Sequence, residues 1–239
     1  MHLSVIIPSY NGENEIKGTV FAVRDYLSNQ NYDWEIIVVS DGSKDKTAEV
    51  VESFKSDIPN LRFINNKINH GKGYSVRQGI LASTGDLRLF MDDDNSTTID
   101  QIENFMPYIK EGYDVVIGSI EAKGAKINEH AQWYRRFLGH ISKLIIRVIA
   151  GLWEIKDSQR GFKLFSAKAA NDIFSKAKIN RFGFDIEVLV LAKKLGYKIK
   201  EVPVVWNNPS GSSVNLKSYF QVFGELLRIK WYSWTGKYN

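Results

Sequence analysis

The sequence contains no cysteine among its 239 residues. Without thiols, neither a disulfide nor a thiolate metal site can form, so a bound metal must use oxygen or imidazole ligands. No stretch approaches the roughly 20 consecutive apolar residues that a membrane-spanning helix needs. Residues 1–8 also lack the basic start and long apolar segment of a secretion signal, and they predict a first strand instead. These absences favour a cytoplasmic protein.

Hydrophobic side chains make up 44% of the chain, which is enough for one substantial core at this length. The formal charge of +5 fits a polyanionic partner such as nucleic acid, an anionic lipid surface or a phosphorylated ligand. It fits equally well a mildly basic surface with no such partner. Because net charge does not decide between these interpretations, the positions of the charged motifs carry the argument.

The first half of the chain alternates short β-branched runs with amphipathic segments. This pattern predicts an α/β domain of the Rossmann-like kind, with a mostly parallel central sheet flanked by helices. Strands are expected at 3–8, 35–40, 61–64, 87–91 and 115–118, and helices at 13–28, 46–54, 75–82 and 100–109. The second half breaks the alternation: it predicts amphipathic helices at 133–153, 184–195 and 216–234, and a last strand at 199–206.

Three consecutive carboxylates, Asp92, Asp93 and Asp94, directly follow the strand expected at 87–91. Like charges this close repel one another, and a cation removes that cost. A hard ion such as Mg²⁺ or Mn²⁺, held by one or two carboxylates, keeps positions for phosphate oxygens. The alternative is a helix N-terminus, since residues 95–98 are capping types. The carboxyl end of a strand, where ligands of open sheets bind, favours the cation.

Asp41 follows the second strand, where an acidic residue can accept hydrogen bonds from a ribose or a base edge. An isolated Asp-Gly-Ser is also a common turn and cap. The first strand is not followed by the glycine-rich loop with which dinucleotide-binding folds hold pyrophosphate. An acid-bound metal is therefore the candidate that holds the phosphates.

Residues 5–11 (VIIPSYN), 37–45 (IVVSDGSKD) and 91–94 (MDDD) resemble the successive motifs of family 2 glycosyltransferases with the GT-A fold. Further segments, 71–73 (GKG), 161–165 (GFKLF) and 184–187 (FDIE), resemble the branch that glucosylates or mannosylates polyprenyl phosphates. The resemblance implies one catalytic domain over residues 1–239. Its residues 1–118 are expected to bind the nucleotide sugar, and residues 119–239 the acceptor.

The resemblance also implies roles for individual residues. Asp92 and Asp94 are expected to bind Mg²⁺ or Mn²⁺ and the diphosphate, and Asp94 and Asp185 are the expected catalytic residues. The residues expected to bind the donor nucleotide are Pro8, Tyr10, Glu13, Asp41, Lys72 and Asp93.

The acceptor phosphate is expected to meet several basic residues, because guanidinium groups suit phosphate geometry. The related enzymes usually have an arginine after the Gly-Ser that ends the fifth strand, but Ile120 stands here. They also often have a lysine after a Gly-Ser near the C-terminus, which residues 211–213 lack. The candidates in this chain are Arg135, Arg136, Arg160 and Lys217.

Two acidic residues in the segment 184–187 (FDIE) are candidate bases. A phosphate monoester has its second pKa near ~6, so the acceptor is already ionised and needs cations more than a base. Asp185 and Glu187 do not share a helix face at a spacing of two, and we expect Asp185 to face the site and orient the donor or the arginines. The alternative for Asp185 is a helix cap after Gly183.

The resemblance implies inverting transfer of a hexose to a polyprenyl, dolichyl-type phosphate. Glucose from UDP-glucose is the expected donor, with mannose from GDP-mannose as the alternative. A lipid acceptor implies peripheral contact with the cytoplasmic face of a membrane, directly or through a separate membrane protein. Residues 134–149 and 219–234 combine apolar, aromatic and basic side chains that suit a headgroup region, although such helices can also simply cover a core.

Two rival functions use the same sequence differently. A glycosyltransferase acting on a hydroxyl of a glycan or small molecule fits the absence of an arginine at Ile120. A non-catalytic basic module would use only the charge. We expect no nucleic-acid partner, because the motifs point to a nucleotide sugar.

Overall fold

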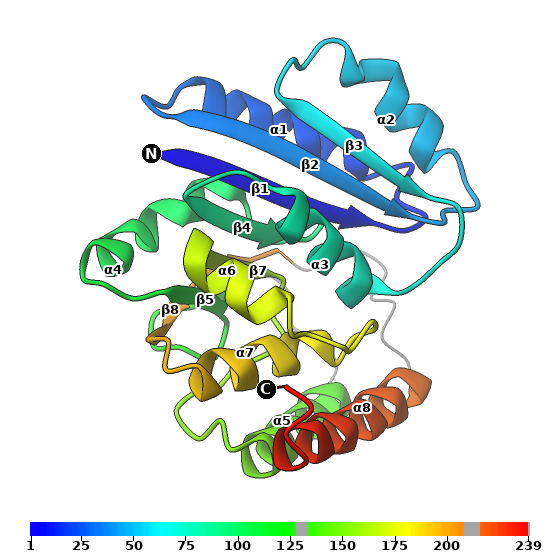
Figure 1. Ribbon diagram of the computed structural model, residues 1–239. Helices are drawn as coiled ribbons and strands as arrows, with labels where there is room; N and C mark the ends of the chain where they lie inside the picture. Colours follow the sequence, from blue (N-terminus) through cyan, green and yellow to red (C-terminus); the bar gives the residue numbers. More distant parts are fainter. Residues whose placement is uncertain (128–132, 208–215, 239) are drawn as a thin grey trace.

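A seven-stranded sheet runs through the computed structural model, which describes residues 1–127, 133–207 and 216–238 (Figure 1). The strand order is β3-β2-β1-β4-β7-β5-β8, and all neighbours are parallel except the two pairs that contain β7. The predicted mostly parallel sheet is therefore confirmed. The strands are β1 (His2–Ser9), β2 (Asp33–Asp41), β3 (Leu61–Asn66), β4 (Leu87–Met91), β5 (Val115–Ser119), β7 (Phe162–Ser166) and β8 (Ile199–Pro203).

Helices cover both faces of this sheet. One layer holds α1 (Ile16–Ser28), α2 (Thr47–Lys55), the 3₁₀ helix η1 (Ile99–Asn104) and α4 (Met106–Lys110). The other holds α3 (Lys72–Ala82), α6 (Ala167–Phe174) and α7 (Phe184–Lys194). In β1, Val5 and Ile7 face the first layer and Ile6 faces the second, and all three are fully buried. Because alternate side chains of a strand point to opposite faces, a central strand covered on both sides is apolar at most of its positions.

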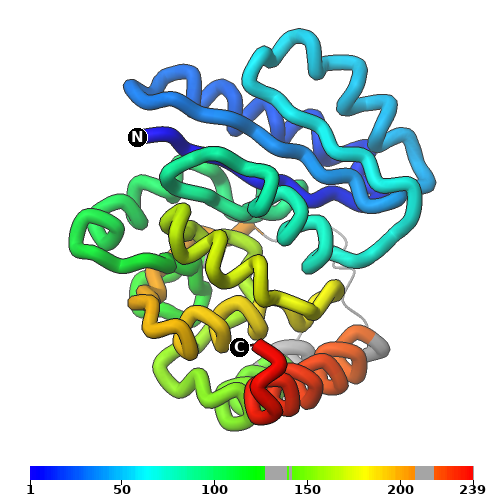
Figure 2. Tube along the Cα trace, in the orientation of Figure 1, coloured from blue at the N-terminus to red at the C-terminus, as the bar shows by residue number. Residues whose placement is uncertain are grey.

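The helices α5 (Trp133–Ala150) and α8 (Leu216–Trp234) lie side by side beyond α7, and the chain trace in Figure 2 shows the same arrangement. Ile146 of α5 and Leu226 and Ile229 of α8 join the core on the α7 side. A small second sheet pairs β6 (Lys126–Ile127) with β9 (Val205–Trp206). Within the described residues, no helix is both long and apolar enough to cross a membrane.

Several elements differ from the expectation. The helix expected at 100–109 is divided into η1 and α4, since Pro107 has no amide to donate to the preceding turn. The strand expected at 199–206 is two strands, β8 and β9, which belong to different sheets. Strand β7 and helix α6 were not predicted, and β7 inserts between β4 and β5, so both halves of the chain build one sheet.

Candidate active site

The three aspartates after β4 point in different directions from one short turn. The Asp92 carboxylate lies 2.6 Å from the ammonium group of Lys72, at the start of α3. Asp93 turns its carboxyl group toward the Ser9 hydroxyl at the end of β1. Asp94 accepts a hydrogen bond of 2.9 Å from the amide of Ser96. This divergence limits the repulsion between the carboxylates and connects the turn to β1, α3 and the chain beyond it.

Two glycines allow the close approach of these carboxylates. A Cβ atom at Gly161 would lie 2.2 Å from both carboxylate oxygens of Asp92, so a side chain at this position would displace Asp92. The Asp92 amide in turn donates to the Gly161 carbonyl at 3.2 Å. At Gly12, a Cβ atom would lie 2.6 Å from Oδ2 of Asp93. The motifs around both glycines therefore belong to the same site as the aspartates.

A second ion pair lies beside the first. Lys163 on β7 is fully buried and donates a hydrogen bond to Asp185, in the first turn of α7. The ammonium groups of Lys72 and Lys163 lie 5.5 and 5.8 Å from the ring centre of Phe90. Burial alone would lower the pKa of Lys72, but the carboxylates of Asp92, Asp185 and Asp93 raise it above its ordinary value. Lys72 is therefore cationic and is stabilised by these three carboxylates.

Two carboxyl groups of the site, those of Asp93 and Asp185, have pKa values above the ordinary value of an aspartate. Burial, together with the charge of Asp92, raises the pKa of Asp93 to about 6, although the nearby Ser9 hydroxyl opposes this shift. Burial also raises the pKa of Asp185, against the opposing effect of Lys163 and Lys72. Shifted carboxyl groups in contact with cations are typical of functional sites.

The loops after β1 and β2 are bound to each other by side-chain hydrogen bonds. Glu13 accepts from the amide of Lys46 at 2.9 Å, and Asn11 accepts from the amide of Lys44 at 2.8 Å. Asn11 has a φ of 55°, a conformation that asparagine tolerates better than most residues. Tyr10 is exposed at the tip of this loop, 47% of its surface being accessible. The predicted contacts of Tyr10, Glu13 and the buried Pro8 with the nucleoside stay predictions.

Asp41 has two partners that the sequence did not indicate. Its carboxylate oxygens accept hydrogen bonds from the amides of His70, at 3.1 Å, and Gly71, at 2.6 Å. The residue is buried, and it fixes the loop that leads to Lys72. A carboxylate accepts more than two hydrogen bonds, so a contact of Asp41 with the nucleoside also stays a prediction.

Among the predicted acceptor cations, Arg160 is the one whose side chain the structure describes. Its guanidinium group lies 4.6 Å from the ring centre of Trp206, and its Nε atom lies 3.6 Å from the buried carboxylate of Asp157. Asp157 also accepts from the amide of Ile120 at 3.2 Å. Arg160 thus approaches the end of β5, where the resemblance led us to expect an arginine. The side chains of Arg135, Arg136 and Lys217 lie outside the described residues.

Glu187 has a role that separates it from Asp185. Its carboxylate accepts from the amide of Ile179, at 2.8 Å, and from the hydroxyl of Tyr238, at 2.6 Å. It is fully buried, and burial raises its pKa despite these hydrogen bonds. The prediction that Asp185 and Glu187 do not share a face is confirmed: Asp185 points to the lysines, and Glu187 holds the segment before α7 and the C-terminal turn.

The acidic turn provides ligand types that suit a hard divalent cation. Within the described part of the chain, no three acidic or histidine side chains converge as a ready metal site. Asp92 and Asp94 provide two carboxylates, and the buried side-chain oxygen of Asn95 has no hydrogen-bond partner among the described residues. Mg²⁺ and Mn²⁺ are commonly held by one or two carboxylates together with substrate phosphates, so these residues fit such an ion.

Sequence reasoning missed Lys163 and Asp157. Both lie in segments that were interpreted as turns or motifs, whereas the structure buries them beside the site. A lysine inside the apolar run 162–165 was the available signal, because a buried ammonium group requires a partner.

Known proteins resemble this chain over most of its length. The sequence pattern of glycosyl transferase family 2 matches residues 4–174. Dolichyl-phosphate beta-glucosyltransferase ALG5A of Trichomonas vaginalis is 34% identical over 236 residues, which cover 96% of this chain and 73% of the relative. The dolichyl-phosphate beta-glucosyltransferase of Homo sapiens is 30% identical over 252 residues, which cover 99% of this chain and 77% of the relative.

Solved structures share the fold at low sequence identity. Mannosyl-3-phosphoglycerate synthase from Rubrobacter xylanophilus has a TM-score of 0.72 at 14% identity, over 99% of this chain and 75% of that one. Glucosyl-3-phosphoglycerate synthase from Mycobacterium tuberculosis, solved with Mn²⁺, UDP-glucose and phosphoglyceric acid, has a TM-score of 0.69 at 18% identity, over 95% and 79% of the two chains. The expected GT-A architecture is confirmed.

Proposed function

Since the chain belongs to glycosyl transferase family 2, we propose that it transfers glucose from UDP-glucose to a dolichyl-type polyprenyl phosphate. The observation that carries this proposal is the 34% identity to a dolichyl-phosphate beta-glucosyltransferase over 96% of the chain. The acidic turn, paired with Lys72 at the carboxyl edge of the sheet, supports it as a place for a nucleotide diphosphate. The acceptor's hydrocarbon chain would keep the protein at the cytoplasmic face of a membrane.

The donor is proposed to lie across the ends of β1, β2 and β4. Tyr10 and Asp41 would contact the nucleoside, and Asp93, next to Ser9, would contact the ribose. Mg²⁺ or Mn²⁺ bound by Asp92 and Asp94 would neutralise charge on the diphosphate as it leaves. Lys72, which already lies 2.6 Å from Asp92, would add a second positive charge beside the diphosphate.

The reaction is proposed to be one in-line displacement with inversion. An oxygen of the acceptor phosphate forms a bond to the anomeric carbon of glucose, while the bond from that carbon to the diphosphate oxygen breaks and UDP leaves. No proton has to be removed from an ionised phosphate, so the acceptor side needs cations. Arg160 is the described candidate, with Arg135, Arg136 and Lys217 as further proposed contacts.

Asp185 is proposed to position cations. Its carboxyl group accepts a hydrogen bond from Lys163 and lies near Lys72, so it is engaged by two ammonium groups, an arrangement that suits fixing Lys72. This arrangement supports a phosphate acceptor over a hydroxyl acceptor, because a hydroxyl requires a base within hydrogen-bond reach.

The test is an acceptor comparison with the purified chain and Mn²⁺. UDP-glucose and GDP-mannose are each incubated with a short-chain polyprenyl phosphate, the matching polyprenol and phosphoglycerate. We expect glucosylated polyprenyl phosphate, which mass spectrometry of the lipid extract detects. Equal transfer to the polyprenol, or transfer to phosphoglycerate alone, would refute the proposed acceptor. Faster turnover of GDP-mannose would refute the proposed donor.

A further inference from the structure

Helix α8 is apolar on two faces. Val222, Leu226 and Ile229 are buried against the core. A second row, which we term the α8 stripe, follows the same helical spacing on the outside and consists of Phe220, Phe223, Leu227, Trp231 and Trp234. Phe220 and Trp234 expose 78% and 86% of their surfaces. A helix that only covers a core needs one apolar face, so the stripe indicates a further contact.

Exposed apolar side chains also occur on α5 and in the turn after it, where the exposed Glu154 follows Trp153. Leu144, Val148 and Trp153 are also exposed. Residues 133–153 contain neither aspartate nor glutamate, and the single acid in residues 216–238 is Glu225. That carboxylate is buried and accepts from the amide of Gly183 at 2.7 Å, so it serves the fold. The outer face is therefore apolar and basic.

A groove of about 330 Å³ lies at the edge of the stripe and is flanked by Arg181 and Arg228. Within the described part of the chain, neither guanidinium group has a hydrogen-bond or ion-pair partner. With Glu225 at the groove, the two arginines leave a net positive charge there. Just after the helix, the Lys237 ammonium group lies 3.9 Å from the Trp231 ring centre. Unpaired cations beside exposed aromatic rings match the chemistry of a phospholipid headgroup layer.

We propose that the α8 stripe, with Arg181 and Arg228, docks on an anionic bilayer so that α8 lies in the plane of the headgroups. Apolar side chains would enter the acyl boundary, and the arginines would contact lipid phosphates. A protein partner would need a groove that is both acidic and apolar to match this surface. An anionic bilayer offers negative charge and an apolar interior, and it needs no specific shape.

This surface leads back to the candidate active site. Strand β9 is followed by Asn207, whose amide donates to the Ser96 carbonyl at 2.9 Å, next to the acidic turn. The chain then enters α8 at Leu216, and β6, the partner of β9, precedes α5. This inference rests on the proposed function. The docking would present the acceptor phosphate to the carboxyl edge of the sheet while the hydrocarbon chain of the acceptor stays in the bilayer.

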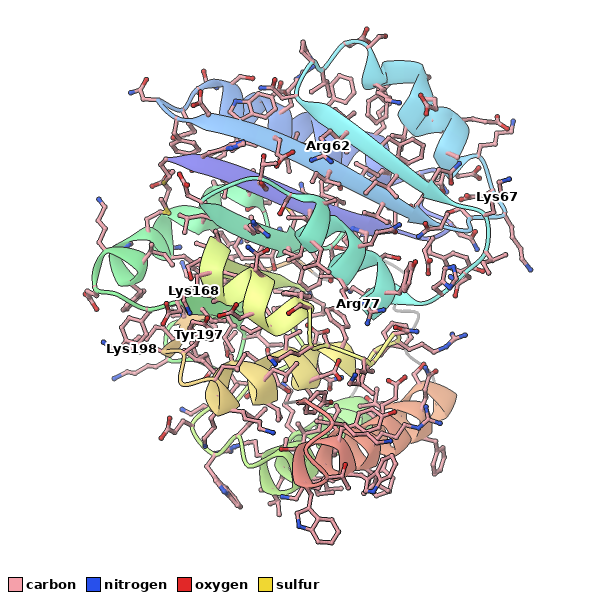
Figure 3. The ribbon with its side chains drawn as sticks, in the orientation of Figure 1. Arg62, Lys67, Arg77, Lys168, Tyr197 and Lys198 are labelled. Carbon is pink, nitrogen blue, oxygen red and sulfur yellow. The ribbon has the colours of Figure 1, made fainter. Side chains whose placement is uncertain are left out.

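The experiment is co-sedimentation with vesicles of phosphatidylcholine, with and without phosphatidylglycerol. We expect binding that requires the anionic lipid and weakens about fivefold for each of Arg181→Gln and Arg228→Gln. A combined Phe220→Ser, Trp231→Ser and Trp234→Ser variant should lose more than about tenfold in binding. Matched controls are Leu81→Ser, an exposed apolar residue on α3, and Lys198→Gln, which Figure 3 shows far from α8.

The outcomes separate this inference from the proposed function. Equal binding of the stripe variant and the wild type, or equal binding to neutral and anionic vesicles, would overturn the docking. If the wild type forms a dimer in solution that the stripe variant loses, and the wild type does not bind vesicles, the face contacts a second copy of the chain. That result would also overturn the docking. The stripe variant should still glucosylate a short-chain polyprenyl phosphate without vesicles. Failure of the wild type in that assay would instead count against the proposed function.

Discussion

The carboxyl edge of the sheet and the outer face of α5 and α8 differ in whether their polar groups have partners inside the chain. At the sheet edge, Asp41, Asp92 and Asp185 are each bound by amide or ammonium groups of distant segments. On the helical face, Arg228 has no partner among the described residues, and Trp234 is exposed. This difference supports the two proposals: a small charged ligand at the sheet edge and a membrane contact on the helical face.

The largest effect is expected from Asp92→Asn. The change removes a carboxylate from the proposed metal and leaves Lys72 without its nearest partner. We expect transfer to fall by about 10²–10³-fold or more, with weaker UDP-glucose binding in the presence of Mn²⁺, measured by calorimetry. Asp100→Asn, an exposed acid at the start of η1, is the matched control and should keep both properties. Near-normal transfer by Asp92→Asn would place the donor elsewhere.

Asp185→Asn tests whether the buried pair stabilises the edge. The change removes the carboxylate from the buried Lys163 ammonium group and leaves it the Arg160 carbonyl, so we expect the free energy of unfolding in urea to fall by about 3–5 kcal/mol. The double variant Lys163→Met with Asp185→Leu should recover much of this stability, since apolar residues fill the space. Transfer should stay low in the double variant because Lys72 loses a neighbouring charge. Restored transfer would show that the pair serves the fold alone.

Glu35 lies near the start of β2, at the opposite end of the strands from the acidic turn. Its carboxylate accepts several hydrogen bonds but is not part of the proposed site, so replacing it should affect stability and not transfer. Burial alone would raise its pKa, but hydrogen bonds from Thr84, Ser4 and Arg62 lower it to about 2. Figure 3 shows Arg62 beside the strands of the N-terminal half.

The low pKa of Glu35 fixes the sign of its pH dependence. Its stabilising contribution is present above the ordinary value of 4.5 and is lost as the pH falls from 4.5 toward 2. This loss amounts to about 3 kcal/mol. Glu35→Gln should flatten stability against pH in that range and leave transfer at neutral pH unchanged. A steep acid transition that survives in Glu35→Gln would contradict this assignment.

The smallest effect is expected from Gly161→Ala. The added methyl group overlaps the Asp92 carboxylate and should turn it away from Lys72, weakening donor binding by about tenfold. Gly18→Ala, where a Cβ atom meets nothing within 4 Å, is the control. Unchanged UDP-glucose affinity in Gly161→Ala would mean that Asp92 can relocate without loss.

The sequence predicted the regions that depend on local pattern. Period-two and helical spacing located most strands and helices, and the position of Asp92 after a strand placed the acidic turn at the ligand edge. Strand β7 escaped detection because Lys163 interrupts its apolar run, and the carboxylate that pairs with this lysine, Asp185, lies 22 residues away. Pairings of this kind depend on tertiary contact, which no local period encodes.

The two faces of α8 illustrate the same limit. The helix was predicted with its observed bounds at 216–234. Its apolar residues, however, are distributed around the helix, and packing against α5 and α7 decides which of them stay outside. The partners of Asp41 were equally hidden, since the amides of His70 and Gly71 reach it only through the fold.

The most direct test of the account is a single-turnover reaction of the purified chain with UDP-glucose, Mn²⁺ and a short-chain polyprenyl phosphate, run beside Asp92→Asn. Mass spectrometry follows the lipid phosphate, and nuclear magnetic resonance assigns the anomeric linkage of the product. The account predicts one β-linked glucose on the phosphate with the wild type and none with Asp92→Asn in the same time. An α-linked product, or equal product from both proteins, would contradict it.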